Sequence, residues 1–249
     1  MTERPGTDAD PVRNEAIASS WTTAIVREVD KPTAGFVRLR LEVKDREDHV
    51  PGQHYVVRLR APDGYTAQRS YSIASDPADP LVELMVECLP RGEVSSFLHD
   101  VVEVGDELEV RGPIGRWFVW GGTTPSICVA GGSGVVPFVS MMRYARRTGT
   151  EAKLTVVASA QYRDRLPYAD ELESYGAFIA LTRENQPLAD GSERVAAHLY
   201  PDEVAALAEG VERAYVCGSV GFVSFVGRIL GEAGVRSDTV RVEQFGPTG

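Results

Sequence analysis

SICVAGGSGVVPFVSMMRYARR, residues 126–147, is the segment that decides how this chain is expected to fold. It begins with a short apolar, β-branched run, passes through a glycine-rich turn at 131–134, and continues with apolar residues at helical spacing. Glycine allows the backbone a positive φ in such a turn, and Pro137 suits the first turn of a helix, where no backbone N–H is needed. The segment therefore predicts a strand, a tight turn and a helix, which is the repeating unit of a parallel α/β sheet.

The same alternation continues to the end of the chain. Further predicted strands cover 153–160, 177–183, 214–219 and 239–245, and predicted helices cover 135–147, 167–175, 201–210 and 222–234. Apolar, β-branched runs that alternate with helices are typical of buried parallel strands. Residues 121–249 are therefore predicted to form an α/β domain with a doubly wound parallel sheet and right-handed crossovers.

The preceding part of the chain has a different period. Six short β-rich runs, separated by turn residues, cover 22–29, 35–43, 54–61, 69–75, 81–89 and 106–112. Strands of this length and spacing predict a small antiparallel β-barrel over 21–120, with one short helix at 93–102. Residues 1–20 carry no hydrophobic periodicity and are predicted to be a flexible tail.

Charge and composition exclude several kinds of partner. The 249 residues include 26 Lys and Arg against 36 Asp and Glu, a net charge of −10, which gives no general attraction to nucleic acid or to an anionic membrane. No stretch has the ~18 uninterrupted apolar residues of a spanning helix, and the amino terminus lacks the apolar core of a signal peptide. We therefore expect a cytoplasmic protein that binds neither nucleic acid nor membrane.

Metal ligands are not expected. Cys88, Cys128 and Cys217 are too widely spaced for a Cys-x-x-Cys pair and too few for a four-thiolate cluster, so they are predicted to be free thiols. The histidines have no ligand spacing such as His-x-x-x-His. The sequence therefore predicts no metal site.

Two short motifs carry polar chemistry, and the first is the glycine loop. Gly131, Gly132, Ser133 and Gly134, followed by Pro137, precede a predicted helix, and the first N–H groups of a helix bind anions such as phosphates. The spacing is neither Gly-x-Gly-x-x-Gly nor a lysine-containing phosphate loop. By itself the loop is therefore equally consistent with a structural turn.

The second motif is Arg69-Ser70-Tyr71-Ser72, which lies in a predicted strand. Arginine binds a phosphate with two hydrogen bonds, tyrosine packs on a planar ring, and serine hydrogen-bonds a ring nitrogen. The residues alone leave an alternative open, in which Arg69 of an exposed strand pairs with a carboxylate.

In their order along the chain, these motifs resemble the ferredoxin–NADP reductase family of flavoproteins over nearly all of 21–249. The resemblance rests on Pro51-Gly52-Gln53, Arg69-Ser70-Tyr71-Ser72, Arg91-Gly92-Glu93-Val94-Ser95-Ser96-Phe97-Leu98, Gly112-Pro113-Ile114-Gly115, Gly131-Gly132-Ser133-Gly134-Val135-Val136-Pro137, Cys217-Gly218-Ser219 and Glu243-Gln244-Phe245. Ser133 and Ser219 depart from the threonine and proline that are usual in the family. Each match is unspecific alone, but the whole series in family order is hard to obtain by chance.

The resemblance implies that the barrel binds FAD and that the α/β domain binds NADPH or NADH, with hydride transfer between the two. The implied flavin contacts are Arg69, Ser70, Tyr71, Ser72, Gly92, Val94, Ser95, Ser96 and Phe245. The implied nucleotide contacts are Gly131, Gly132, Ser133, Gly134, Pro137, Thr182, Arg183, Cys217 and Gly218. The residues implied to act at the reacting rings are Ser72, Cys217, Glu243 and Phe245.

Individual roles also follow from the resemblance. Arg69 would hold a flavin phosphate, Tyr71 would pack on the isoalloxazine, and Ser72 would lie near flavin N5. Thr182-Arg183 lies where NADPH-using relatives carry a hydroxyl and an arginine for the 2′-phosphate, which favours NADPH over NADH.

The implied function is an NAD(P)H-dependent flavoprotein reductase that passes electrons to a separate acceptor, such as a ferredoxin, a flavodoxin or an oxygenase component. Because the sequence ends shortly after Phe245, no fused iron–sulfur domain is expected there. Two other functions stay open. One is a reductase of free flavin, ferric chelates or quinones, and the other is a non-catalytic nucleotide-binding or redox-sensing subunit.

Overall fold

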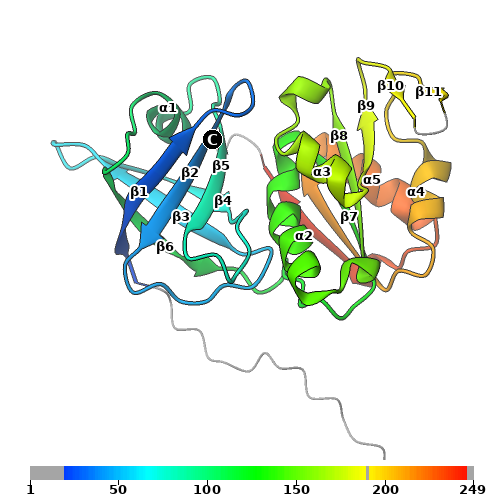
Figure 1. The fold of residues 1–249 in the computed structure, drawn as a ribbon, viewed down its shortest axis with the longest axis horizontal. Helices are drawn as coiled ribbons and strands as arrows, with labels where there is room; N and C mark the ends of the chain where they lie inside the picture. Colours follow the sequence, from blue (N-terminus) through cyan, green and yellow to red (C-terminus); the bar gives the residue numbers. More distant parts are fainter. Residues whose placement is uncertain (1–19, 189–190, 246–249) are drawn as a thin grey trace, which may run out of the picture.

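Two domains of different architecture lie side by side in the computed structural model, which describes residues 20–188 and 191–245 (Figure 1). The first is an antiparallel β domain and the second is a parallel α/β domain, so both predicted architectures are confirmed. Apart from residue 20, the predicted tail lies outside the described residues.

A six-stranded antiparallel sheet forms the first domain. Its strands are β1 (Thr22–Asp30), β2 (Phe36–Val43), β3 (His54–Arg60), β4 (Thr66–Ser72), β5 (Val82–Glu87) and β6 (Glu107–Ile114). Their order is β4-β3-β6-β1-β2-β5, and a bridge between Ile73 and Leu84 joins the two outer strands, so the sheet closes on itself. Because successive strand residues face opposite sides, alternate apolar side chains meet inside this barrel and form its core.

One helix, α1 (Glu93–Asp100), covers an end of the barrel. It buries Val94 and Leu98 in the barrel core. The helix is two residues shorter than the sequence predicts, and β4 begins before the predicted strand at 69–75. Neither difference changes the strand order or the side of the sheet that each residue faces.

The second domain is a five-stranded parallel sheet between two layers of helices (Figure 1). Its strands are β7 (Ser126–Gly131), β8 (Leu154–Ala160), β9 (Phe178–Leu181), β12 (Arg213–Gly218) and β13 (Val240–Gln244), in the order β13-β12-β7-β8-β9. The helices are α2 (Val136–Thr148), α3 (Ala169–Tyr175), α4 (Pro201–Leu207) and α5 (Val220–Glu232). The first strand of the domain lies in the middle of this order, as in a doubly wound sheet.

Neighbouring residues of one strand belong to different cores. Cys128 and Ala130 of β7 pack in a cluster with side chains of α2 and α3, whereas Ile127 and Val129 pack with α4 and α5. Both faces of the sheet are therefore buried, which explains why its strands read as continuous apolar runs.

Several connections differ from the sequence-based expectation. The glycine turn is itself a 3-10 helix, η1 (Gly132–Val135), and further 3-10 turns occur at η2 (Glu151–Lys153), η3 (Arg163–Arg165) and η4 (Ser237–Thr239). A two-stranded hairpin of β10 (Gln186–Pro187) and β11 (Glu193–Arg194) was not predicted. Within the described ranges, no helix is long and apolar enough to cross a membrane.

The segment between the domains is fixed by backbone contacts. Phe118 and Trp120 are buried in the α/β domain, and the backbone N–H of Trp120 donates to the carbonyl oxygen of Pro51 at 3.1 Å. The next residue, Gly52, has φ +98°, and a Cβ atom there would overlap the carbonyl oxygen of Phe118. The barrel therefore meets the inter-domain segment at a point where only glycine fits.

Gly52→Ala should destabilise the protein by roughly 2–4 kcal/mol, because the cost of a positive φ adds to the cost of an overlap with main-chain atoms. Gly35→Ala is the matched control, since Gly35 also has a positive φ, +77°, but no atom lies within 4 Å of the position of its Cβ. Urea denaturation of both variants checks this. Equal losses of unfolding free energy would contradict the importance of the contact with Phe118.

Candidate active site

The glycine loop packs directly on the end of β12. A Cβ atom on Gly134 would overlap the carbonyl oxygen of Cys217, so only glycine lets η1 approach this strand so closely. Gly132 has φ +56°, and Pro137 lies in the first turn of α2. The structure therefore brings the loop and the Cys217-Gly218 segment together at the carboxyl edge of the sheet, where doubly wound sheets bind ligands.

Phe222, in the first turn of α5, was not singled out from the sequence. Its ring lies against both glycines that end the neighbouring strands, because a Cβ atom on Gly131 or on Gly218 would lie 2.8 Å from a ring carbon. Ser219 caps this helix, and its Oγ accepts a hydrogen bond from the Phe222 backbone N–H at 3.3 Å. The only signal in the sequence is a phenylalanine four residues after Gly218, which helical periodicity assigns to the core.

The carboxyl-terminal strand adds Glu243 and Phe245 to this edge. Glu243 is the register partner of Cys217, and the backbone N–H of Phe245 donates to the carbonyl oxygen of Gly218 at 3.0 Å. The half-buried Phe245 ring packs on the cluster that contains Cys217. The sequence-predicted residues Cys217, Gly218, Glu243 and Phe245 therefore lie together.

Burial controls the protonation of two of these groups. It raises the pKa of the Cys217 thiol well above its usual value, and the charge of Glu243 adds to the effect. The thiol is therefore protonated at neutral pH and is a poor nucleophile. Burial also raises the pKa of the Glu243 carboxyl to about 7, so this group can hold or release a proton near neutrality.

The side chains of the motif in β4 differ in their exposure to solvent. Arg69 and Ser70 are exposed, while Ser72 is buried at the end of the strand. Arg69 donates to the carbonyl oxygen of Gln68 at 2.7 Å, and no ion pair links it to a carboxylate among the described residues. Among the same described residues, the buried Tyr71 hydroxyl has no hydrogen-bond partner, and burial raises its pKa. A cation without a carboxylate and a hydroxyl without a partner are groups that a bound ligand would satisfy.

The serine segment forms the start of α1. Gly92 is the N-cap residue with extended backbone, and the buried Ser95 hydroxyl accepts from the Leu89 backbone N–H and donates to the Gly92 carbonyl, both at 3.2 Å. The Ser95 side chain thus shapes the loop, and the buried Val94 side chain faces the barrel core. For a ligand, the segment offers the backbone N–H groups of the helix terminus and the half-buried Ser96.

Thr182 and Arg183 directly follow β9, at the same carboxyl edge as the glycine loop. The end of β9 lies two strands from β7, about 10 Å at the usual spacing of strands. Arg183 is exposed, and Glu184 accepts from the Arg163 backbone N–H at 2.9 Å. An ion pair with Glu184 would make Arg183 a purely structural surface residue. No such ion pair is found within the described chain.

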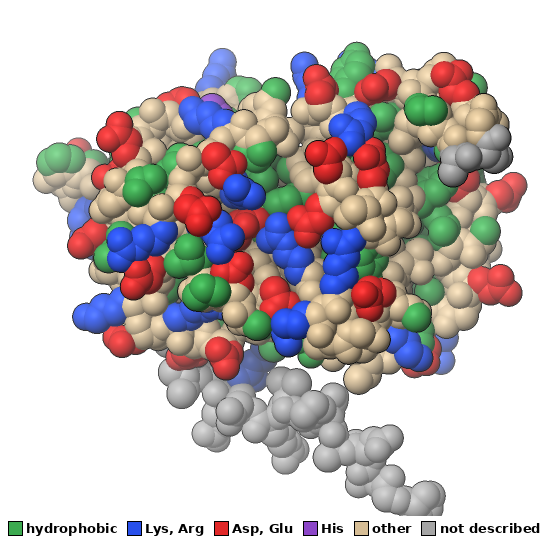
Figure 2. All heavy atoms as spheres, viewed as in Figure 1, with side chains coloured by type: hydrophobic (Ala, Val, Ile, Leu, Met, Phe, Trp, Pro, Cys, Tyr) green, Lys and Arg blue, Asp and Glu red, His purple; other side chains and the backbone are tan. Residues whose placement is uncertain are grey.

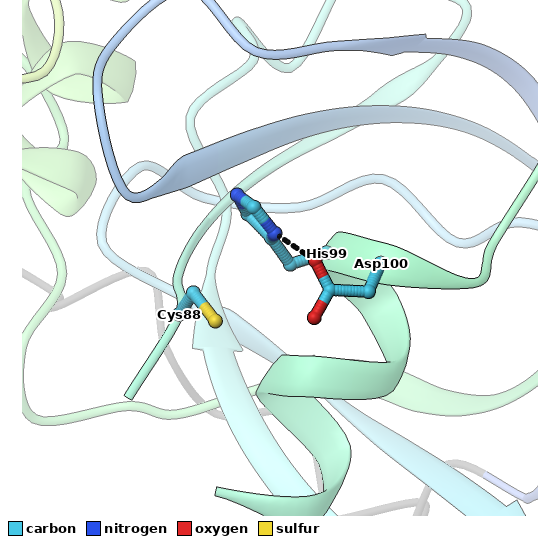
Figure 3. A group of neighbouring side chains, drawn as sticks. All are labelled: Cys88, His99 and Asp100. Carbon is cyan, nitrogen blue, oxygen red and sulfur yellow. Dashed lines mark hydrogen bonds and ion pairs between the residues drawn. The ribbon is translucent and has the colours of Figure 1, made fainter. Parts of the chain in front are cut away.

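Cys88, His99 and Asp100 form the one group of potential metal ligands found among the described residues (Figure 3). Their ligand atoms lie within 4.8 Å of one another, and His99 Nδ1 is 2.6 Å from a carboxylate oxygen of Asp100. This contact with His99 lowers the pKa of Asp100. The group is a hydrogen-bonded histidine and aspartate beside a thiol, and the expectation of no metal stays a prediction.

Comparison with known proteins identifies the family. A family model for the oxidoreductase FAD-binding domain matches residues 26–119, and one for the oxidoreductase NAD-binding domain matches residues 128–228. Ferredoxin–NADP reductase B of Sorangium cellulosum is 32% identical over 231 residues, which are 86% of this chain and 94% of that protein. The chain belongs to the ferredoxin–NADP reductase family. It is an oxidoreductase with one FAD-binding and one NAD(P)-binding domain.

Other family members differ in length. Methane monooxygenase component C of Methylosinus trichosporium is 33% identical over 172 residues, 66% of this chain, and the match spans only 49% of that longer protein. The flavohem-like FAD/NAD-binding domain of nitric oxide dioxygenase from Vibrio cholerae superposes with a TM-score of 0.72 at 22% identity, over 91% of this chain and 99% of that one. The latter likeness shows the shared fold of the two domains.

Residues of the barrel fit an FAD molecule. The Tyr71 hydroxyl, the Arg69 cation and the start of α1 all belong to the barrel domain. Tyr65 connects the last two, because its hydroxyl donates to Glu93 at 2.9 Å and its pKa responds to the charge of Arg69. This fit is independent of the family match, since among the described residues the Tyr71 hydroxyl has no hydrogen-bond partner and Arg69 has no carboxylate partner.

Tyr71→Phe should weaken FAD binding about tenfold while leaving the stability of the FAD-free protein unchanged or slightly raised. The reason is that a buried hydroxyl without a partner costs free energy in the free protein and gains one hydrogen bond, roughly 1–1.5 kcal/mol, from the ligand. Tyr55→Phe is the control, because Tyr55 lies opposite Tyr71 on the neighbouring strand and its hydroxyl also has no hydrogen-bond partner among the described residues. Its ring, however, is fully buried against Gly112. Flavin titration and thermal unfolding measure both effects, and equal affinities of the two variants for FAD would contradict the role of Tyr71.

Glu243 should make the protein less stable as the pH rises. An unfolded glutamate has a pKa near 4.5 and the folded one about 7, so the folded state holds the extra proton between these values. The free energy of unfolding should therefore fall by roughly 3 kcal/mol as the pH rises from below 4.5 to above 7, and then level off.

Glu243→Gln isolates this effect from other groups. Burial lowers the pKa values of His49 and His54 below those of unfolded histidines. These two groups therefore raise the free energy of unfolding as the pH increases from the folded to the unfolded pKa. The difference between the wild-type and variant stability curves removes their contribution. Parallel curves from pH 4.5 to 8 would show that the Glu243 carboxyl titrates normally.

Proposed function

We propose that this protein is an NAD(P)H-dependent flavoprotein reductase that passes electrons to a separate acceptor, namely a ferredoxin, a flavodoxin or an oxygenase component. The observation that carries the proposal is that the chain segments directly after its two motifs share one hydrophobic cluster. Ala74, two residues beyond Ser72, packs in one cluster with Val136, two residues beyond Gly134. The end of the proposed flavin motif therefore adjoins the end of the proposed nucleotide loop.

Bound FAD accepts a hydride from a reduced nicotinamide and passes the electrons on. The protein's part is to position the reactants and to control their surroundings. Arg69 and the first N–H groups of α1 would hold the flavin pyrophosphate, and Tyr71 and Phe245 would pack on its ring. The buried Ser72 hydroxyl would donate to the ring nitrogen that becomes reduced.

The α/β domain would hold the nucleotide along its carboxyl edge. The N–H groups of the loop from Gly131 to Gly134 would bind the pyrophosphate, and Thr182 and Arg183 would bind the phosphate of NADPH. The end of β12 that carries the buried, protonated Cys217 thiol would lie beneath the nicotinamide. Glu243, with its pKa of about 7, would take up or release a proton when the charge beside it changes.

A separate acceptor is supported by the family. Methane monooxygenase component C is, by its name, one component of an oxygenase system, and this chain spans about half of its length. Figure 2 shows acidic and basic side chains interleaved over the face that crosses both domains, so no uniform charge on this face selects the partner.

Anaerobic stopped-flow mixing with NADPH or NADH tests the function. We expect the absorbance of the FAD-loaded protein near 450 nm, the usual flavin band, to bleach, and to bleach faster with NADPH. Arg183→Gln should slow bleaching by NADPH about tenfold and leave NADH unaffected, because a phosphate contact is worth roughly 1.5 kcal/mol.

Two results would contradict the proposal. FAD-loaded protein that neither nucleotide bleaches would instead be a nucleotide-binding or redox-sensing subunit. The second result is that quinones or ferric chelates oxidise the reduced protein and that no ferredoxin, flavodoxin or oxygenase component oxidises it faster. The protein would then be a reductase of small acceptors.

A further inference from the structure

A buried carboxylate joins the two domains. Glu83 of β5 is only 2% exposed, and both of its strongest partners come from the α/β domain. Arg143 of α2 donates an N–H to Glu83 Oε1 at 2.9 Å, and the Tyr168 hydroxyl donates to the same oxygen at 2.7 Å. The Glu83 backbone N–H is also satisfied, because it donates to Ser75 Oγ at 3.0 Å.

Arg143 extends this contact into a network. Its guanidinium also donates to the Ala74 carbonyl at 3.1 Å and, through two further N–H groups, to both carboxylate oxygens of Glu171 at 2.8 Å. A planar guanidinium held on several sides has one preferred orientation. Burial and the charge of Glu83 raise the pKa of Tyr168, which therefore remains a neutral donor.

One face of α2 carries a series of contacts with the barrel. Val136 and Val139 pack with Phe36, Ala74 and Met85 of the barrel. One turn further on, Ser140 Oγ donates to the Ser75 carbonyl at 2.7 Å, and the next turn presents Arg143. These positions share a helix face because side chains repeat every three to four residues. The helix that begins at the glycine loop is thus fixed to the barrel over two turns.

We infer that Glu83 is a positioning residue for hydride transfer, because through Arg143 and Tyr168 it fixes α2, and with it the glycine loop, against the barrel. The inference rests on the proposed reductase function. Apolar contacts alone allow the two domains to shift along their interface. Hydrogen bonds are directional, so two of them to one carboxylate oxygen fix the positions of Arg143 and Tyr168 relative to Glu83. A displacement of about 1 Å between reactants can cost roughly a hundredfold in rate.

Binding and rate should respond differently to loss of this contact. The residues proposed to bind the nucleotide lie within the α/β domain, and those proposed to bind FAD lie mainly on the barrel. A change in the angle between the domains therefore leaves each binding site nearly intact and alters only how the two bound rings meet. The expected signature is a lower limiting rate of flavin bleaching at unchanged nucleotide affinity.

The test uses the full, FAD-loaded chain with Glu83→Gln and Arg143→Met. At saturating NADPH, we expect each variant to bleach at least tenfold more slowly than wild type, with less than a threefold change in the dissociation constant for NADP⁺. Arg147→Met is the matched control. Arg147, also on α2, pairs across the domains with Asp76 at 2.7 Å, but its side chain is 45% exposed, so this variant should stay within twofold of wild type.

A second readout does not depend on activity. Hydrogen exchange of the FAD-free protein should become faster over 136–143 in Glu83→Gln and stay unchanged in Arg147→Met. If Glu83→Gln does not fold, Tyr168→Phe removes one donor while keeping the ion pair, and a smaller decrease of the limiting rate is expected.

The outcomes separate the two proposals. If wild-type protein is not bleached, the proposed reductase function fails. If wild type is bleached and Glu83→Gln reacts like Arg147→Met, or loses rate only in proportion to nucleotide affinity, the positioning role of Glu83 is wrong.

Discussion

The close contact between Gly134 and the Cys217 carbonyl is the constraint on which the site depends. It presses the first turn after β7 against the end of β12, at a distance that no side chain allows. The Phe222 ring then covers the glycines that end both strands, and the Phe245 backbone closes the neighbouring edge by bonding to Gly218. Small residues here provide room for a ligand and also let the backbone segments meet.

The helix that leaves this loop also forms the domain interface. Because α2 begins at the glycine loop and contacts the barrel through Val136, Ser140 and Arg143, the loop cannot move relative to the barrel without disturbing buried contacts. Two domains that bind different cofactors need such a fixed element, since hydride transfer depends on the relative position of two rings.

Periodicity predicts most of the fold and fails where a residue's surroundings come from another part of the chain. The two sheets, their direction and the loop could be predicted because each depends on local patterns of apolar residues and glycine. Glu83 could not: in the run LVELMVECL an alternating pattern places a glutamate toward solvent, yet β5 is buried on this side by α2. Phe222 was missed for the same reason, because helical spacing does not distinguish a core residue from one that covers two strand ends.

Two carboxylates in this structure, the buried Glu83 and the partly buried Glu243, show how surroundings separate structural from chemical roles. Glu83 accepts from an arginine and a tyrosine that come from the opposite domain, so its charge is compensated and its geometry is fixed. Among the described residues, no hydrogen bond or ion pair offsets the partial burial of the Glu243 carboxyl, and its pKa rises to about 7. A carboxylate held by several fixed partners sets the position of those partners, whereas a carboxylate with a pKa near neutrality can take up or release a proton. The first therefore suits an inter-domain joint, and the second suits a site where charge changes during a reaction.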